Sequence, residues 1–483
     1  MGQADDIAPG CKISRGDVAV LADRISGVVL TPDDDRYRSE CASFNTAADY
    51  SPAIVVGAAS VEDIQVAVLF ARGHDLPVAA INSGHGGPAT INGGVLVTTR
   101  RMSGIEIDPE RRQARVGAGV RWQQVVDAAV PHGLAPLVGS SGTVGVVGYA
   151  LGGGLSPTMG RAFGWMSDHI TALDVVTADG ALRRVDPADD PELFWALRGA
   201  RDSLGIVTAM EFALFPVTCL YGGALTFAGE HAEAVLTAYA DLTAVAPDEL
   251  TSSLAFLRGP APGGQVGSSG HTLRVQVRVS WIGAVGEAEE LLTRLRASAP
   301  VLLDTVEEIP YGDFARISSD PAEPLPFSER TLTLKPLSTG LVRELLAGVG
   351  PGEINEASVI TLRHLGGALS RSDAPAAVRG GQFALWIIAL GDTRDDVAAS
   401  WAEHLSARLT PWLSPEKLVN FMSRVDLPAD EVRAAFGPGT YRRLQQVKGA
   451  YDSENLFRAS YDLRPHATDE PPGWPGTAPG INR

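Results

Sequence analysis

The first 217 residues alternate short apolar segments with amphipathic ones. Apolar runs bounded by glycine, proline or asparagine are typical of strands, and apolar positions three or four residues apart are typical of helices. A cap at 60–62 begins a predicted helix that runs through His74, and a second helix over 122–132 ends at Gly133. A third helix is expected over 191–197. The predicted strands are 53–56, 77–81, 95–98, 113–116, 170–177 and 206–214.

Residues 218–425 follow a different alternation of predicted strands and helices. In the strand over 273–280, valines alternate with Gln276 and Arg278, which is the period of a half-buried strand facing a surface or a cleft. The loop over 259–270, rich in glycine, proline and serine, and the proline-rich loop over 318–328 are of a kind that borders binding sites, although idle connections are commoner. The other expected strands are 224–226, 358–363 and 383–389, and the expected helices are 232–244, 287–297, 341–347 and 395–409.

Composition narrows the class of protein. A chain of 483 residues suggests two or three domains, and 45% hydrophobic with 20% charged residues is typical of a soluble protein. The formal net charge of −17 disfavours nucleic acid and anionic membrane surfaces as partners. With neither a secretory signal nor an apolar membrane span in the pattern, we expect a cytoplasmic protein. Its three cysteines show no disulfide framework and no metal-ligand spacing, so we expect no metal site.

The densest unusual feature is the segment 139–154, in which seven of sixteen residues are glycine. Glycine loses much chain entropy on folding, so this density is costly unless the backbone must approach something closely. Bare backbone N–H groups bind phosphate oxygens, which predicts a wall against a large, flat, phosphate-bearing ligand. A glycine-rich turn between packed elements is the alternative, and composition alone does not separate the two. The spacing and late position of the segment exclude the Rossmann fingerprint.

A second candidate site follows the predicted strand 77–81, where Asn82-Ser83-Gly84-His85-Gly86-Gly87 holds a histidine between glycines. Such a histidine presents a sterically open imidazole. Taken alone, it is more often an inert turn residue.

Together the two segments resemble the FAD-binding domain of the berberine-bridge-enzyme-like oxidases, within the vanillyl-alcohol-oxidase class of flavoproteins. The resemblance continues in register through nearly the whole chain and is strongest between Ala53 and Val217. The further segments that carry it are 175–180, 190–199, 205–208 and the closing stretch from Tyr441 to Arg458.

The resemblance implies an α+β, two-domain, PCMH-type FAD-binding fold with a central antiparallel-sheet substrate domain backed by helices. It implies an FAD-binding domain over 1–217, a substrate domain over 218–425, a segment over 426–470 that returns to the FAD domain, and a flexible tail over 471–483. The active site is expected between the flavin ring and the central sheet, in a monomer or homodimer.

The cofactor implied is FAD, bonded through a ring nitrogen of His85 to the flavin 8α-methyl carbon. Relatives with two links carry a cysteine at the position of Ser141, so a single link is expected here. The run 198–205 replaces a usually glycine-rich stretch, and its bulkier side chains are expected either to reshape the wall near the flavin ring or to lie outward. The residues implied to bind FAD are Asn82, Ser83, Gly84, His85, Gly86, Gly87, Gly139, Ser140, Ser141, Gly142, Thr143, Val144, Gly145, Gly148, Tyr149, Gly153, Gly154, Gly205, Ile206, Val207 and Asn455.

The resemblance further implies a two-electron oxidation of a small alcohol or amine, natural-product-like or sugar-like. Hydride passes to flavin N5, and dioxygen is the electron acceptor. The base is unassigned, because Leu418 stands where many relatives carry a tyrosine two residues before Asn420. Tyr149 and His364 are the candidate bases, and Asn420 fits the last strand of the substrate domain. A flavin-templated cyclisation or elimination, and flavin binding without turnover, are the alternatives.

Overall fold

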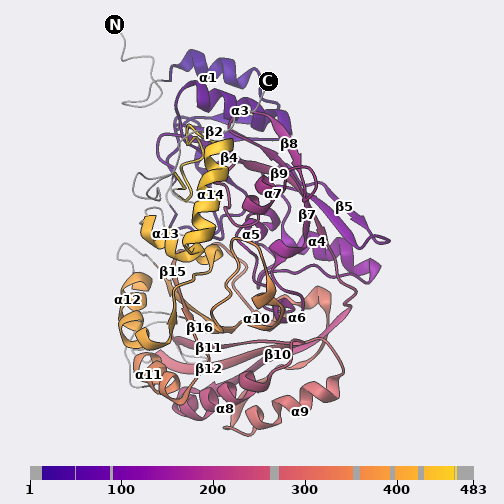
Figure 1. The fold of residues 1–483 in the computed structure, drawn as a ribbon, viewed down its shortest axis with the longest axis vertical. Helices are drawn as coiled ribbons and strands as arrows, with labels where there is room; N and C mark the ends of the chain where they lie inside the picture. Colours follow the sequence, from indigo (N-terminus) through magenta and orange to yellow (C-terminus); the bar gives the residue numbers. More distant parts are fainter. Residues whose placement is uncertain are drawn as a thin grey trace.

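The computed structural model describes residues 13–48, 50–86, 91–260, 271–351, 359–391, 397–422, 429–461 and 463–464 (Figure 1). It has three sheets. The two smaller ones lie in the upper half of Figure 1, and a large antiparallel sheet with its helices fills the lower half. The predicted α+β fold with a central antiparallel sheet is confirmed.

Two sheets from the first part of the chain form the upper half. In the four-stranded sheet, β2 and β3 run parallel to β4 between them, and β1 adds to β2 antiparallel. The five-stranded sheet is antiparallel, in the order β5-β6-β9-β7-β8. Helix α3 (Val61–Gly73) contacts both β4 and β7, so it lies between the two sheets. The strands are β1 Val28–Leu30, β2 Ile54–Gly57, β3 Val78–Ile81, β4 Val95–Thr98, β5 Ile105–Asp108, β6 Gln113–Gly117, β7 Ile170–Val176, β8 Leu182–Val185 and β9 Ile206–Ala213.

The large sheet has the strand order β13-β10-β12-β11-β16-β17-β15-β18, with β14 also paired to β10. Alternate residues of its strands, such as Val277, Leu254 and Leu385, are buried in one core cluster with the helices of the lower half. Those helices are α8 Ala232–Val245, α9 Val285–Arg296, α11 Thr339–Val349 and α12 Val397–Leu409. The strands are β10 Cys219–Ala228, β11 Leu250–Pro260, β12 His271–Trp281, β13 Val301–Asp304, β14 Glu307–Pro310, β15 Phe327–Leu334, β16 Val359–His364, β17 Phe383–Leu390 and β18 Leu413–Ser414.

The opposite face of this sheet, which we call the open face, is more polar. Gln276 and Arg278 on β12 alternate with the buried valines, as the sequence predicts for a half-buried strand. Thr361 and Arg363 on β16, and Glu329 on β15, occupy equivalent positions. The open face is turned toward the upper half of the molecule rather than toward the helices.

The last part of the described chain returns to the upper half as α13 (Ala429–Phe436) and α14 (Pro438–Tyr451), the latter in contact with α7 (Pro191–Leu197) (Figure 1). A buried ion pair at the end of α14 fixes this return. Lys448 Nζ donates to Asp452 Oδ2 at 2.6 Å, to the Ser203 carbonyl at 2.7 Å and to the Phe457 carbonyl at 3.0 Å. Lys448 and Asp452 are 1% and 2% exposed.

Lys448→Met is expected to lower the free energy of unfolding by roughly 3–5 kcal/mol, because it leaves the Asp452 carboxylate buried without a counter-charge. Urea unfolding followed by circular dichroism measures the loss. The matched control is Arg72→Ala, which removes a solvent-exposed pair with Glu454 (2.8 Å) and is expected to cost less than about 1 kcal/mol. Equal losses for the two variants would contradict the structural role of the buried pair.

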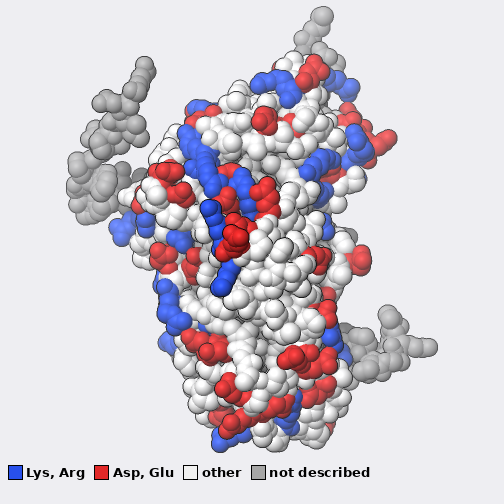
Figure 2. Space-filling model, turned by 90° about the vertical axis from the view of Figure 1, so that its right-hand side faces the viewer, with Lys and Arg blue, Asp and Glu red and all other residues white. Residues whose placement is uncertain are grey.

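Acidic and basic side chains are interspersed on the face shown in Figure 2, and several acidic groups gather toward its lower end. Within the described residues, every helix is too short or too polar to cross a membrane. No group of three or more His, Cys, Asp or Glu side chains suited to a metal ion occurs in that same part of the chain.

Most predicted elements are confirmed, and several agree closely. Predicted strand 95–98 is β4, predicted helix 191–197 is α7, and predicted helix 122–132 is α4 (Trp122–Ala129) continued by a 3₁₀ turn that ends at Gly133. The sequence reading missed β11 and β15. Asn420 and Phe421, predicted to lie on the last strand of the substrate domain, lie instead in the 3₁₀ turn Val419–Phe421, so Asn420 does not belong to the sheet. Residues 261–270 of the predicted loop 259–270 and the whole predicted tail 471–483 lie outside the described residues.

Candidate active site

A cavity of about 530 Å³, which we call the central cavity, separates the two halves of the molecule. One wall comes from the turn after β3 and from the glycine segment. The other comes from the open face of the large sheet and from the predicted loop 318–328, which contributes Asp320 and Pro321. A segment near the C-terminus, Asn420 and Phe421, completes the lining.

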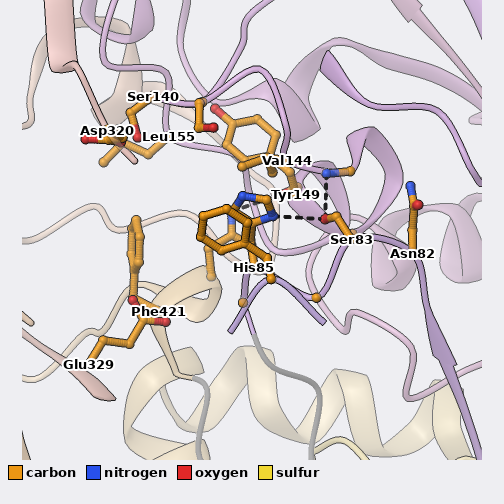
Figure 3. A pocket seen from close by; sticks show the side chains of 18 of the residues that line it. Asn82, Ser83, His85, Ser140, Val144, Tyr149, Leu155, Asp320, Glu329 and Phe421 are labelled. Carbon is orange, nitrogen blue, oxygen red and sulfur yellow. Dashed lines mark hydrogen bonds between the residues drawn. The ribbon is translucent and has the colours of Figure 1, made fainter. Parts of the chain in front are cut away.

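The imidazole of His85 lies inside the central cavity, as Figure 3 shows. Its Nε2 is 2.9 Å from Thr143 Oγ1, its Nδ1 is 3.2 Å from Ser83 Oγ, and its ring stacks on Phe44 with centroids 3.7 Å apart. Burial, followed by the nearby Arg121 charge, lowers the pKa of His85 to about 4. The ring is therefore neutral at physiological pH, with an uncharged nitrogen able to act as a nucleophile.

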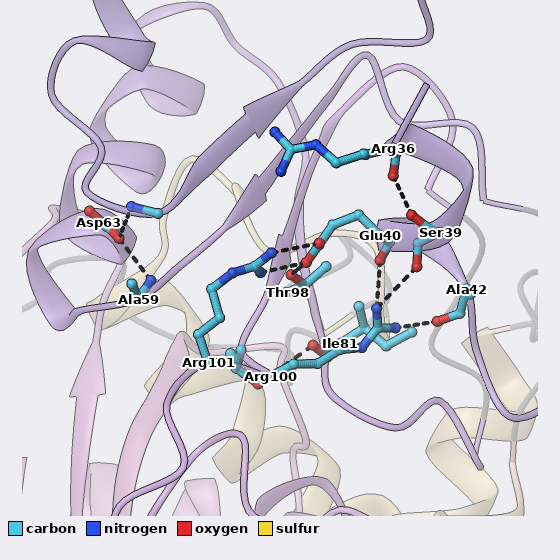
Figure 4. A network of polar contacts seen from close by, with 12 residues as sticks. Arg36, Ser39, Glu40, Ala42, Ala59, Asp63, Ile81, Thr98, Arg100 and Arg101 are labelled. Carbon is cyan, nitrogen blue, oxygen red and sulfur yellow. Dashed lines mark hydrogen bonds and ion pairs between the residues drawn. The ribbon is translucent and has the colours of Figure 1, made fainter. Parts of the chain in front are cut away.

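A polar network behind β3 and β4 holds the His85 turn in place (Figure 4). Arg100 Nε donates to the Asn82 carbonyl at 3.0 Å, and its Nη1 donates to the Glu40 carbonyl at 2.9 Å. Arg101 pairs with the Glu40 carboxylate through two hydrogen bonds of 2.7 and 2.8 Å. The hydrogen bond from Arg101 lowers the pKa of Glu40 to about 2. The turn is thus tied at its start to helix α2 (Tyr37–Cys41), which lies between β1 and β2 in the chain.

The glycine segment packs directly against this turn. The Gly145 amide donates to Ser83 Oγ at 3.0 Å, and a Cβ at Gly145 would lie 2.9 Å from Asn82 Nδ2. A side chain at position 145 would therefore displace the Asn82 amide. Among the described residues, the amides of Gly139, Ser140, Ser141 and Gly142 have no hydrogen-bond partner, and the first three of these residues line the cavity. Such a row of amides suits an anionic group.

The structure brings most of the predicted cofactor residues to one cavity. The predicted residues that line it are Asn82, Ser83, Gly84, His85, Gly86, Gly139, Ser140, Ser141, Val144, Gly145, Gly148, Tyr149, Gly205, Ile206 and Val207. Thr143 does not line the cavity but contacts His85. Those that lie elsewhere are Gly142, Gly153, Gly154 and Asn455, and Gly87 lies outside the described residues.

These residues fit an FAD molecule. The wall offers unpaired amides and hydroxyls, and the Asn82 Oδ1 atom is buried without a hydrogen-bond partner among the described residues. At Gly148, in helix α5 (Val146–Leu151), an added Cβ would meet no protein atom within 4 Å and would project into the cavity wall. The protein itself therefore does not require glycine at this position.

Gly148→Ala is expected to weaken FAD binding by roughly 1–3 kcal/mol through steric conflict with the cofactor. The stability of the apoprotein should stay equal or rise by about 0.5–1 kcal/mol, because alanine is the better helix residue. The measurements are the flavin-to-protein ratio after reconstitution and the melting temperature of the apoprotein. The matched control is Gly449→Ala in α14, also open to solvent, which should leave FAD binding unchanged. Full FAD occupancy in Gly148→Ala would contradict a cofactor against this wall.

The three predicted catalytic residues have different surroundings. Tyr149 lines the cavity, and its hydroxyl is buried without a partner among the described residues. Burial raises the pKa of Tyr149 well above its ordinary value, so the hydroxyl stays protonated and is unsuited to be a base. Asn420 lines the cavity, and its Nδ2 donates to the Tyr149 carbonyl at 2.9 Å. Leu418 is buried in a small apolar cluster.

His364 does not line the central cavity. It is buried at the end of β16, where its Nε2 is 3.2 Å from Arg161 Nη1 and its ring stacks on Phe383. Burial, followed by the Arg161 charge, lowers the pKa of His364 to about 3. Its surroundings indicate a structural role rather than that of a base.

The sequence predicts that Arg278 faces a surface or a cleft, but the prediction assigned no role in the site to the charged groups of the open face. Glu329 is 4% exposed and lines the cavity, and its Oε2 accepts a hydrogen bond of 2.8 Å from Trp386 Nε1. Arg278 and Arg363 line the cavity on neighbouring strands. Figure 3 shows Glu329 and Phe421 on the other side of His85 from Asn82 and Ser83. The signal that could have found Glu329 is the period-two pattern of 327–334, of which only the first two residues fall in the predicted loop 318–328 and the rest carries no predicted element.

Arg201 also lines the cavity. It belongs to residues 198–205, the segment that replaces a usually glycine-rich stretch of the family. Its Nη2 donates to the Gly86 carbonyl at 2.9 Å, and its Nη1 lies 3.5 Å from the Tyr461 hydroxyl. The side chains of this segment were expected either to reshape the cavity wall or to lie outward, and the position of Arg201 agrees with the first expectation.

Two family models match the chain. The model described as "FAD binding domain" matches residues 52–186, and the model described as "Berberine and berberine like" matches residues 419–461. The first contains the His85 turn and the glycine segment, and the second contains Asn420 and the ion pair of α14.

The similarity to characterised relatives extends over most of the chain. The (R)-6-hydroxynicotine oxidase of Paenarthrobacter nicotinovorans is 26% identical over 480 residues, which cover 92% of this chain and 98% of that protein. The crystal structure of 6-hydroxy-D-nicotine oxidase from Arthrobacter nicotinovorans has a TM-score of 0.79 at 24% identity, with 92% and 98% covered. The xylooligosaccharide oxidase of Myceliophthora thermophila has a TM-score of 0.77 at 21% identity, with 93% and 98% covered.

Proposed function

Because the chain is an FAD-linked oxidoreductase of the berberine-bridge-enzyme-like family, we propose that it oxidises a small alcohol or amine by two electrons with dioxygen as acceptor. The observation that carries the proposal is the single cavity in which His85 and the Glu329 carboxylate lie on opposite walls. The names of similar proteins support the substrate class, since they include oxidases of a hydroxylated nicotine and of xylooligosaccharides.

The upper wall of the cavity is proposed to hold the cofactor. When bound, FAD accepts two electrons and a proton from a substrate and passes them to an acceptor. The unpaired amides of Gly139, Ser140 and Ser141 would hold phosphate oxygens, and a ring nitrogen of His85 would hold the flavin through a single covalent link. Ser141 is hydrogen-bonded to Thr143 at 2.8 Å and has no thiol with which to form a second link.

The proposed base is Glu329. A two-electron oxidation of an alcohol or amine requires a group that accepts the O–H or N–H proton within hydrogen-bond reach of the substrate. Glu329 can accept a proton because it is a carboxylate, whereas Arg278 and Arg363 on the same face are already protonated. The indole N–H of Trp386 fixes the orientation of the carboxylate. This assignment replaces Tyr149 and His364 as candidate bases and needs no tyrosine at position 418.

Anaerobic mixing with a panel of alcohols, amines and oligosaccharides tests the proposed function. A substrate is expected to bleach the flavin absorption, and admission of air is expected to restore it with release of one hydrogen peroxide per turnover. Turnover without bleaching or oxygen uptake would favour the non-oxidative alternative and contradict the proposal.

A further inference from the structure

Two arginines stand in one row across the open face of the large sheet. Arg278 on β12 and Arg363 on β16 both pair with Ser253 on β11, the strand between them. Residues directly opposite one another in antiparallel strands point to the same face. Both arginines therefore belong to the cavity wall, with the small residue Ser253 between them in the register.

Arg363 is held rigidly without a hydrogen-bonded counter-ion. It is 8% exposed, and its Cζ lies 4.5 Å from the Trp386 ring centroid and 5.3 Å from that of Phe421. Stacking on two aromatic faces orients a guanidinium while leaving its N–H groups available in its plane. Within the described part of the chain, no hydrogen bond and no carboxylate within 4 Å satisfies these N–H groups.

Arg278 is similarly under-satisfied. Its Nε donates to Gln276 Oε1 at 2.8 Å, and among the residues described no further hydrogen bond or ion pair involves it. Burial lowers the pKa of both guanidinium groups, and the Asp320 carboxylate at the cavity edge raises it again. Both remain charged at neutral pH, since arginine has an intrinsic pKa above 12. Two positive charges thus share the cavity lining with two carboxylates, Asp320 and Glu329, and among the described residues neither carboxylate forms an ion pair or hydrogen bond with Arg278 or Arg363.

We propose that Arg278 and Arg363 bind a carboxylate of the substrate, so that this enzyme oxidises a small organic acid that also carries an alcohol or amine. A buried charge is stabilised only by a paired, hydrogen-bonded partner, and the guanidinium fork matches a carboxylate with two parallel bonds. Asp320 and Glu329 offset the two positive charges from a distance, and a ligand carboxylate supplies the hydrogen-bonded partner that neither of them provides. A phosphate dianion would add repulsion from Asp320 and Glu329.

The positions of the arginines and of Glu329 also determine the orientation in which the substrate binds. Trp386 lies between the two sites, with its ring face against Arg363 and its Nε1 donating to Glu329. The acid group therefore binds on one side of Trp386 and the oxidised carbon lies toward Glu329 on the other side. This inference rests on the proposed function for the oxidation, whereas the acid-binding site stands on the two arginines alone.

Binding to the FAD-loaded protein tests the inference without turnover. The probes are benzoate, the uncharged benzamide and phenyl phosphate, each titrated by calorimetry and by the perturbation of the flavin absorption. Benzoate is expected to bind more tightly than both others. Arg278→Gln and Arg363→Gln are each expected to weaken benzoate binding about 10- to 100-fold while leaving benzamide unchanged. Arg274→Gln, four residues earlier on β12 and outside the cavity, should change neither.

Three outcomes would overturn the proposal: benzoate no tighter than benzamide, benzoate binding unaffected in Arg278→Gln, or phenyl phosphate as the tightest ligand. If Arg363→Gln does not fold, Arg278→Gln and the charge-retaining Arg363→Lys carry the test. If no substrate is oxidised but benzoate still binds more tightly than benzamide, the proposed oxidation is contradicted and the acid-binding site is not. The two proposals can therefore fail separately.

Discussion

Replacing Glu329 by glutamine is expected to slow reduction of the flavin by a substrate about 10²- to 10⁴-fold, the usual contribution of a positioned general base. Glutamine has nearly the same shape, and its amide oxygen still accepts the hydrogen bond from Trp386 Nε1. It does not accept a proton at neutral pH. The loss should therefore appear in the rate of anaerobic flavin bleaching measured by stopped flow, while FAD content and melting temperature stay unchanged.

Tyr149→Phe is the matched control, since it also removes a polar atom from the cavity lining. Because the Tyr149 hydroxyl is buried with its pKa raised, it takes up no proton in the reaction, and we expect less than a tenfold change in rate. A wild-type rate in Glu329→Gln, or a larger loss in Tyr149→Phe, would contradict the assignment of the base.

His85→Ala is expected to release all of the flavin into the supernatant after acid precipitation, whereas the parent protein should retain it in the pellet. The variant loses the imidazole, with both of its ring nitrogens, and the stack on Phe44. It should still bind FAD noncovalently, because the amides of 139–142 and the remainder of the wall are unchanged. Absorption spectra of pellet and supernatant measure the partition, and circular dichroism separates loss of the tether from loss of the fold.

His132→Ala, a change at an exposed histidine remote from the cavity, is the control and should leave the flavin in the pellet. Complete release of flavin from the parent protein, or retention by His85→Ala, would contradict the single covalent link.

The lowered pKa of His85 adds a dependence on pH. The ring stays neutral down to about pH 4 rather than 6.5, so covalent attachment to reconstituted FAD should keep a constant rate between about pH 5.5 and 8. For a histidine with the ordinary pKa of about 6.5, the neutral fraction would fall about tenfold by pH 5.5, and the attachment rate would fall with it. Below pH 6.5 the unfolded chain binds more protons at this residue than the folded chain. The contribution of His85 to stability therefore falls as the pH drops from 6.5 toward 4.

The flavin side of the site could be predicted from the sequence because its parts are local. Asn82 to Gly86 follow one strand, and 139–148 form one continuous segment, so their glycine and hydroxyl content is visible in short windows. Predicted cofactor residues that do not line the cavity can have a local structural role instead. At Gly154, for example, the backbone φ is +74° and an added Cβ would collide with the Tyr149 ring, so this glycine serves packing.

The substrate side has no such local pattern. Arg278, Arg363, Trp386 and Glu329 lie on four strands and are separated by as many as 108 positions in the chain. Each occupies an alternate position of an ordinary amphipathic strand, which by itself indicates only a half-buried surface. Even Leu418, read as the place of a missing base, belongs to a packed cluster beside a 3₁₀ turn and not to the sheet.

The sequence by itself determined most of the elements, the α+β class and the family resemblance. It also determined the position of the histidine and of the glycine wall, because these features depend on neighbouring residues and on backbone freedom. Only the tertiary structure decided which polar side chains face the cofactor wall. That choice depends on strand order and register: pairing Ser253 with both Arg278 and Arg363, and Thr361 with Trp386, turns scattered residues into one surface. A shift of one residue in that register would turn the same side chains into the apolar core.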